Sequence, residues 1–258
     1  MTRFFLITVA SVSLLSAQTP ADRSWKILED AIGSDKTDPR GKAVRALGLI
    51  TNNARARQLA EHALSDPKTD VQAAAADALG QMGARQSIPK LIEAIKSNDA
   101  AVVFAAANAL YVLKDPRAYE IYYAVLMGER KTGEGLVDSQ MKMIKDPKAM
   151  ARMGFEAGVG FIPFGGAGLA VFKMVTKDDT SPVRAAAALK LAGDPDPKSA
   201  EALMQMASDK KWLVRAAVVD AIAKRGDPSL LKAVWPLLND DEDTVRFTAA
   251  GAILRLTK

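Results

Sequence analysis

The residues of this chain that could do acid–base or nucleophilic chemistry are few and scattered. His62 is the only histidine, and the chain has no cysteine. His62 follows Glu61 in a stretch with helical periodicity, where a surface position explains an isolated histidine better than general-base work. The sequence has no zinc-ligand spacing, no Gly-x-Ser-x-Gly elbow and no phosphate-binding loop. We therefore expect no enzyme activity, no catalytic residue, no bound cofactor and no metal ion.

Two groups of side chains could still hold a cation, and each has a simpler explanation. Asp178-Asp179 and the acidic run 240–243 lack the glycine and glutamate positions of a calcium loop, so helix capping and solubility explain them better. The thioethers of Met141 and Met143, and of Met150 and Met153, are ligands that select Cu(I). Apolar packing accounts for these methionines more simply, since methionine fills irregular apolar surfaces.

A phrase that recurs every 31 or 32 residues determines which elements position the side chains of this chain. It reads Asp, Val-Arg, several Ala, then Ala-Leu, and the step from the third copy to the fourth is about 50 residues longer than the others. Repeats of this length stack into a solenoid, which works mainly as a binding surface. The six copies end at Leu47, Leu79, Leu110, Leu191, Ile222 and Ile253.

Each repeat is predicted to be a pair of helices. In the second repeat, Asp66-Pro67 opens a helix whose apolar stripe runs from Val71 to Met82, and Gly83 ends it. A second apolar stripe follows from Ile88 to Ile95. We call the helix that carries the Val-Arg phrase the A-type helix and the one after it the B-type helix. No alternation typical of strands is present, so the predicted class is all-α.

The phrase resembles the HEAT repeats of the armadillo-type fold, in particular the short bacterial PBS-lyase HEAT-like repeats. The first copy departs from the family pattern, with Pro39 in place of Val, and the third has Val103 in place of Arg. The resemblance implies a right-handed α-solenoid, and the family includes scaffolds, adaptors and a few lyase subunits. It also implies that the repeated arginines form a ladder between neighbouring repeats. The alternative is a basic stripe that binds acidic partner segments. The residues that carry the resemblance are Asp179-x3-Val183-Arg184, Val214-Arg215-Ala216-Ala217 and Asp243-x-Val245-Arg246.

Residues 1–17 differ from the rest of the chain. A short basic start precedes the apolar run from Phe4 to Leu15, and Ser16-Ala17 offers a small-residue cleavage point. This pattern is typical of a secretory signal peptide, and an uncleaved anchor is the alternative. The expected location is therefore outside the cytoplasm, in the periplasm or secreted. The net charge is +5, but the basic residues are interspersed with acidic ones and form no long basic stripe. We therefore expect no nucleic-acid partner.

Residues 131–180 interrupt the repeats at 18–130 and 181–258, which are predicted to form one continuous solenoid. The stretch 157–172 carries no charge. We predict an apolar helical hairpin that closes a gap between repeats three and four. The alternatives are a partner-binding element and a membrane contact through 157–172, although this stretch is shorter than a spanning helix. The candidate partner-binding residues are Met150, Met153, Phe155, Phe161, Phe164 and Phe172.

The two ends of the chain read as half-repeats. Residues 25–32 look like a lone B-type helix, and the chain stops after the A-type helix that begins near Val245. We expect these half-repeats to cap the array. The function expected from these patterns is non-catalytic protein–protein interaction, as a scaffold or adaptor in the cell envelope. A membrane-associated organiser and a subunit similar to chromophore lyases are the alternatives. The partner and the oligomeric state do not follow from the sequence.

Overall fold

The computed structural model describes residues 19–126 and 179–257, and the regular elements in these two ranges are helices. The prediction of an all-α solenoid is confirmed. The N-terminal range contains α1 (Pro20–Ile32), α2 (Thr37–Leu47), α3 (Ala54–Ala63), α4 (Thr69–Gln81), α5 (Ile88–Ala94), α6 (Ala100–Val112) and α7 (Arg117–Leu126). The C-terminal range contains α11 (Ser181–Leu191), α12 (Pro197–Met206), α13 (Trp212–Arg225), α14 (Leu231–Val234) and α15 (Asp243–Leu256).

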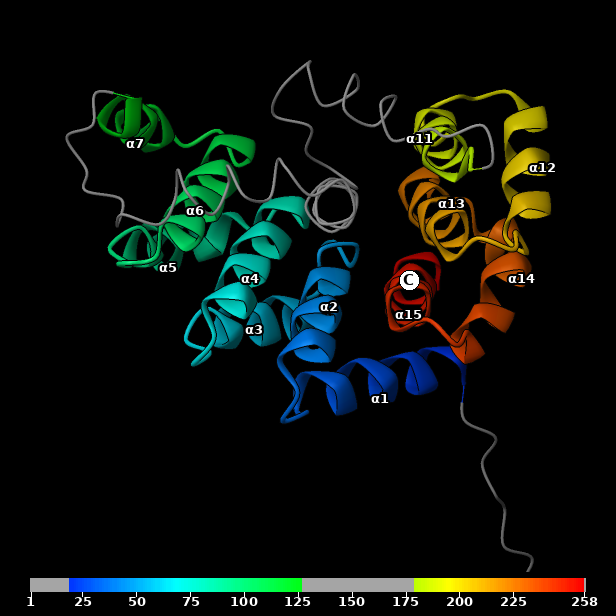
Figure 1. Cartoon of the computed structure of the whole chain (residues 1–258), viewed down its shortest axis with the longest axis horizontal. Helices are drawn as coiled ribbons and strands as arrows, with labels where there is room; N and C mark the ends of the chain where they lie inside the picture. The colour runs from blue at the N-terminus through cyan, green and yellow to red at the C-terminus, as the bar shows by residue number, and fades with distance from the viewer. Residues whose placement is uncertain (1–18, 127–178, 258) are drawn as a thin grey trace, which may run out of the picture.

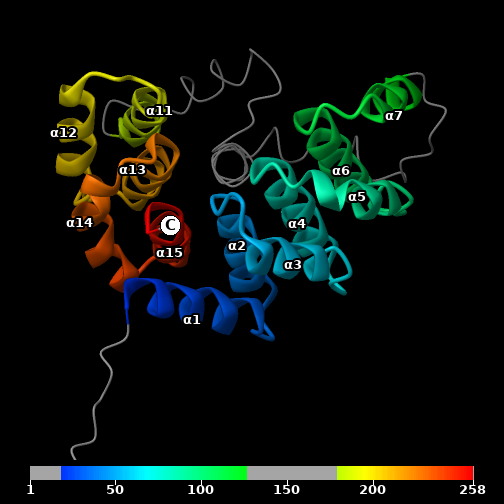
Figure 2. The ribbon, with the colours of Figure 1, turned by 180° about the vertical axis from the view of Figure 1, so that it is seen from behind.

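The helices form two layers that follow an arc (Figures 1 and 2). The A-type helices form the inner layer, in which α11, α13, α15, α2, α4 and α6 pack side by side in that order. The B-type helices α12, α14, α1, α3, α5 and α7 form the outer layer. Short 3₁₀ turns extend the outer layer at Arg85–Ser87, Pro228–Leu230 and Trp235–Asn239.

The order of the repeats in space differs from their order in the chain. The last helix, α15, packs against both α1 and α2, so the first B-type helix of the chain completes the repeat that the last A-type helix begins. The expectation that the two half-repeats cap the array is therefore wrong, because they join each other at its centre (Figure 1).

The third and fourth repeats consequently form the two ends of the arc. The third repeat is α6 with α7 and the fourth is α11 with α12, and they lie far apart in both views. The expected gap between adjacent third and fourth repeats does not exist. Residues 127–178, which link them along the chain, lie outside the described residues, as do residues 1–18.

The core lies between the two layers and is built from leucine, isoleucine and alanine. Leu47, Leu79, Leu110, Ile222 and Ile253, which end the repeated phrase, are completely buried. Burial of one such side chain stabilises the fold by about 1.5–3 kcal/mol. Most alanines of the inner helices are also buried, and their small side chains let neighbouring A-type helices approach closely.

Glycines mark the closest approaches between inner helices. A Cβ atom on Gly251 of α15 would lie 2.6 Å from the carbonyl oxygen of Ala46 in α2. A Cβ on Gly80 of α4 would lie 2.8 Å from the Cα of Ala109 in α6. A side chain larger than hydrogen at either position would push the two helices apart, so glycine is a packing requirement there.

Several inner helices end at a residue whose backbone adopts the left-handed conformation. Gly83 and Gly226 have φ values of +73° and +70°, four residues after the last apolar residue of their phrases. Lys114 takes the same place after α6 with φ of 59°, although it carries a side chain. The amides of Ala84 and Asp115 close these turns by bonding to the carbonyls of Leu79 and Leu110.

Candidate interaction surfaces

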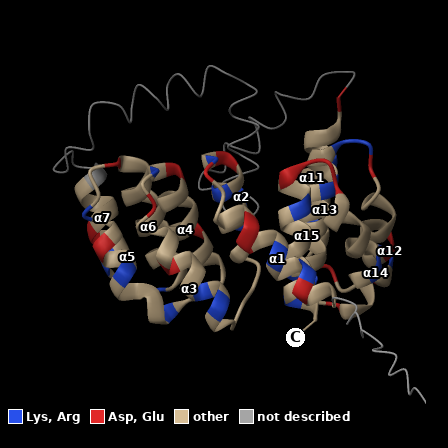
Figure 3. Cartoon of the chain, turned by 90° about the horizontal axis from the view of Figure 1, so that it is seen from below, with Lys and Arg blue, Asp and Glu red and all other residues tan. Residues whose placement is uncertain are grey.

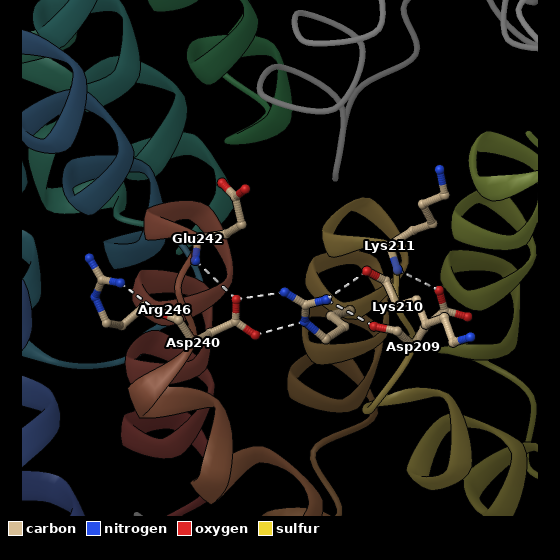
Figure 4. A network of polar contacts seen from close by, with 7 residues as sticks. Asp209, Lys210, Lys211, Asp240, Glu242 and Arg246 are labelled. Carbon is tan, nitrogen blue, oxygen red and sulfur yellow. Dashed lines mark hydrogen bonds and ion pairs between the residues drawn. The ribbon is translucent and has the colours of Figure 1, made fainter.

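An Arg–Asp ladder runs along the edge of the array where the A-type helices begin (Figure 4). Arg215 of α13 donates through Nε and Nη2 to both carboxylate oxygens of Asp240, each at 2.7 Å, and through Nη1 to the carbonyl of Asp209. Arg184 of α11 donates through Nη1 to one carboxylate oxygen of Asp209. Arg215 therefore ties the turn before its own helix to the turn before the next one, and Arg184 links α11 to the turn before α13.

The ladder shifts the pKa values of its members. Burial alone would raise the pKa of Asp240, but hydrogen bonds from Arg215 and from the Glu242 amide outweigh it, so the pKa lies below its ordinary value. The pKa of Arg215 is raised, chiefly by its hydrogen bonds to Asp240. Both groups are charged at neutral pH, and their bidentate geometry is the strong form of an ion pair.

Two arginines of the ladder differ from the sequence pattern. Arg40 of α2 donates through Nε and Nη2 to the carboxylate of Asp66, each at 2.9 Å, although the Val-Arg pair of this repeat is Val44-Arg45. Aligning the repeats on Leu47 would have found Arg40, because it stands seven residues earlier, as Arg215 stands before Ile222. Arg246 bonds to Asp243 and to the carbonyl of Asp240, both within its own repeat.

A second set of polar residues lies two positions before the last apolar residue of each A-type helix. This position is about 200° around the helix from the core-facing residue, so it lies on the side of the helix away from the core. Asp220 is buried and forms an ion pair with Lys224 at 2.9 Å. The hydroxyl of Tyr122 donates to the amide oxygen of Asn108. The six residues at this position, which we call the inner row, are Leu189, Asp220, Gly251, Arg45, Asp77 and Asn108.

Burial is the main influence on the pKa values of the two acids in the inner row, Asp77 and Asp220. It raises the pKa of Asp77 to about 6, against the opposing positive charge of Arg45. It also raises the pKa of Asp220 to about 6, against the charges of Lys224 and Arg255. Asp77 is half-buried, and no hydrogen bond or ion pair joins it to another residue in the described part of the chain. Its carboxylate is therefore poorly compensated.

Exposed tyrosines gather at the α6/α7 end of the array. Tyr111, Tyr119 and Tyr123 are 47%, 63% and 60% exposed, and Val112 beside them is half exposed. Tyr111 and Tyr119 meet edge to face with ring centroids 5.8 Å apart. Tyrosine combines an apolar ring with a polar tip and is enriched at protein interfaces.

The opposite end of the array contains an apolar pocket of about 210 Å³ between α11, α12 and α13. Arg184 lies at this pocket and contributes its only charged side chain. The apolar lining includes Ala188, Leu191, Leu203, Met206, Val214 and Val218.

Other expectations from the sequence have different outcomes. The six candidate partner-binding residues, Met150, Met153, Phe155, Phe161, Phe164 and Phe172, lie outside the described residues. In the two described ranges, no three carboxylate, histidine or cysteine side chains gather where they could hold a metal ion. No helix among the described residues is long and apolar enough to cross a membrane. Basic and acidic residues are interspersed over the helices in Figure 3.

The chain belongs to the HEAT-repeat family. The profile of HEAT repeats matches residues 24–110, 56–126 and 169–254, which together make up most of the sequence. No curated protein matches the chain in sequence at a significant level.

Several solved structures overlay loosely on the whole chain. The CpcE–CpcF complex of phycocyanin lyase from Nostoc is 18% identical, with a TM-score of 0.35 over 96% of this chain and 100% of that one. Human deoxyhypusine hydroxylase is 17% identical, with a TM-score of 0.32 over 93% and 86% of the two chains. A designed armadillo repeat protein is 13% identical, with a TM-score of 0.27 over 90% and 98%. At such scores these likenesses carry no argument about function.

Proposed function

We propose that this protein is a non-catalytic scaffold or adaptor that binds a segment of a partner protein along the inner layer of its helices. HEAT arrays present extended surfaces of this kind, which supports a role in protein interaction. The observation that carries the proposal is the set of charges in the inner row, because Arg45, Asp77 and Asp220 occupy a position that stacking does not require to be charged.

The other repeats support this reading of the inner row. The same position is Leu189 in α11, so the array tolerates an apolar residue there. A poorly compensated charge such as that of Asp77 lowers stability. We infer that it is kept for recognition, and that a lysine or arginine of the partner pairs with Asp77.

A displayed library of random peptides tests this proposal without a known partner. We expect the whole protein to select peptides that carry lysine or arginine, and Asp77→Asn to weaken their binding at least tenfold. Glu201→Gln, which removes an exposed charge from the outer helix α12, is the matched control and should leave binding unchanged. If the library yields no binder, or if its binders tolerate Asp77→Asn, the proposal is wrong.

We also propose that the protein acts outside the cytoplasm, in the cell envelope. The pattern of residues 1–17 supports this location. N-terminal sequencing of the protein from its native cells should find Gln18 as the first residue. An intact Met1 on protein recovered from the cytoplasm would contradict the proposal.

A further inference from the structure

The A-type helices touch through two positions that flank the last apolar residue of each phrase. We call the residue just before it the leading residue and the residue just after it the trailing residue. A Cβ on Gly48, the trailing residue of α2, would lie 3.2 Å from the Cα of Ala78, the leading residue of α4. A Cβ on Gly80, the trailing residue of α4, would likewise lie 2.8 Å from the Cα of Ala109 in α6. Each trailing residue therefore faces the leading residue of the next repeat.

These two positions hold alanine or glycine wherever a neighbouring repeat follows, except at Leu254. The leading residues of the five repeats that have a neighbour on that side are all buried alanines: Ala221, Ala252, Ala46, Ala78 and Ala109. The trailing residues of the five repeats that have a neighbour on the other side are Ala192, Ala223, Leu254, Gly48 and Gly80. Leu254 stands at the α15–α2 junction, where Gly251 makes the close contact instead.

The two ends of the array break this rule at the corresponding positions. The trailing residue of the last repeat in space is Tyr111, which is 47% exposed. The leading residue of the first repeat in space is Lys190, which is also exposed. If two copies stacked end to end in the geometry of the interior, Tyr111 of one would meet Lys190 of the other.

We propose that Tyr111 and Lys190 terminate the array, so that its two end faces do not pair with those of a second copy of this chain. A tyrosine ring does not fit a contact that brings backbones within van der Waals distance of a Cβ atom. A lysine at the same contact would lose its water without gaining a carboxylate. The leading and trailing positions are those through which interior repeats meet, so they decide whether the two end faces can stack.

End-to-end stacking of this kind would not close on itself. A contact between two different faces produces an open chain of copies unless the rotation closes a ring. Removing the two side chains should therefore cause association that grows with concentration and does not stop at a dimer.

Sedimentation of the whole chain tests the proposal. We expect the wild-type protein to remain monomeric and Tyr111→Ala/Lys190→Ala, which restores the residue type of the interior, to reach at least twice the monomer mass as its concentration rises. Tyr111→Phe/Lys190→Arg keeps bulk and charge, so this matched control should stay monomeric. A folded alanine variant that remains monomeric, or a wild-type protein that already stacks end to end, would overturn the proposal.

A second variant tests the same rule inside the array, whatever the folding of the first. Ala223 is the trailing residue of α13 and is completely buried against α15. Ala223→Tyr should lower the melting temperature strongly, and Ala223→Gly should lower it much less. If Ala223→Tyr melts like the wild type, a tyrosine at this position does not prevent stacking and the proposal is wrong.

Discussion

At the scale of single residues, the ladder gives three pairs of neighbouring repeats a charged link, through Arg40, Arg184 and Arg215. The side chains of Arg215 and Asp240 are 16% and 6% exposed, so both are largely excluded from water, and the charge of each is compensated by the other. Removing one partner from a buried pair costs more than the pair itself contributes, because the remaining charge is left unpaired.

Arg215→Ala should therefore destabilise the protein by about 2–4 kcal/mol. Urea unfolding followed by circular dichroism measures this loss. Lys26→Ala removes one member of an exposed pair with Asp30 and should cost less than about 1 kcal/mol. Equal losses in the two variants would mean that the ladder contributes no more than a surface ion pair.

Asp220 predicts an unusual dependence of stability on pH. Its pKa is about 6 in the folded protein and near 3.8 in the unfolded chain, so the folded state binds the proton more tightly. Unfolding therefore becomes easier as pH rises from about 4 to 7, since the buried carboxyl must ionise. Asp220→Asn should flatten this decline in melting temperature. An unchanged profile in the variant would show that Asp220 does not titrate in this range.

The backbone of Lys114 is strained at the end of α6. Its left-handed backbone is unfavourable for a residue with a Cβ atom, whereas Gly226 at the equivalent place has none. Lys114→Gly should stabilise the protein by about 1 kcal/mol, and Gly226→Ala should destabilise it by a similar amount. Thermal melting of both variants checks the two signs, and a loss of stability in Lys114→Gly would contradict the expectation.

At the scale of helices, the contact between α15 and α2 holds the two halves of the array together. Gly251 brings the helices so close that a methyl group would collide with the carbonyl of Ala46. Gly251→Ala should cost about 1–3 kcal/mol, although alanine favours helix. Gly193→Ala, where an added Cβ meets nothing within 4 Å, is the matched control and should not lower the melting temperature. If both variants melt alike, the contact is looser than it appears.

The sequence predicts where the helices form better than it predicts which helices pack against each other. The repeated phrase places an A-type helix at each of its six copies, because burial of Leu79 and its equivalents produces a helical period. It cannot show that α15 meets α1, since the phrase gives each helix a buried face without specifying which helix covers it. For the same reason the sequence does not show that Tyr111 and Lys190 lie at the two ends of the array, because this depends on the order of the repeats in space.

At the scale of the whole molecule, the array is continuous in space but its chain is interrupted at the centre. No peptide bond crosses between α15 and α1, so non-covalent contacts alone join the halves at that point. A cleavage site engineered at Gly133-Glu134 should therefore yield two pieces that elute together. Leu28→Asp, which buries a charge in α1, should make the cleaved pieces separate. Separation of the wild-type pieces under native conditions would contradict this arrangement.

The junction of α1 and α15 also affects how the chain folds. Most contacts in the array join helices that are neighbours in sequence, and such local contacts form fast. The contact between α1 and α15 instead joins segments more than 200 residues apart. The bond from Arg255 of α15 to the carbonyl of Leu49, just after α2, spans a similar separation. At about 5–20 residues per second, synthesis of α15 follows that of α1 by tens of seconds. During this interval the apolar side of α1, with Leu28 and Ala31, lacks one of its two partners, so α1 is made early but is among the last helices to be fully covered.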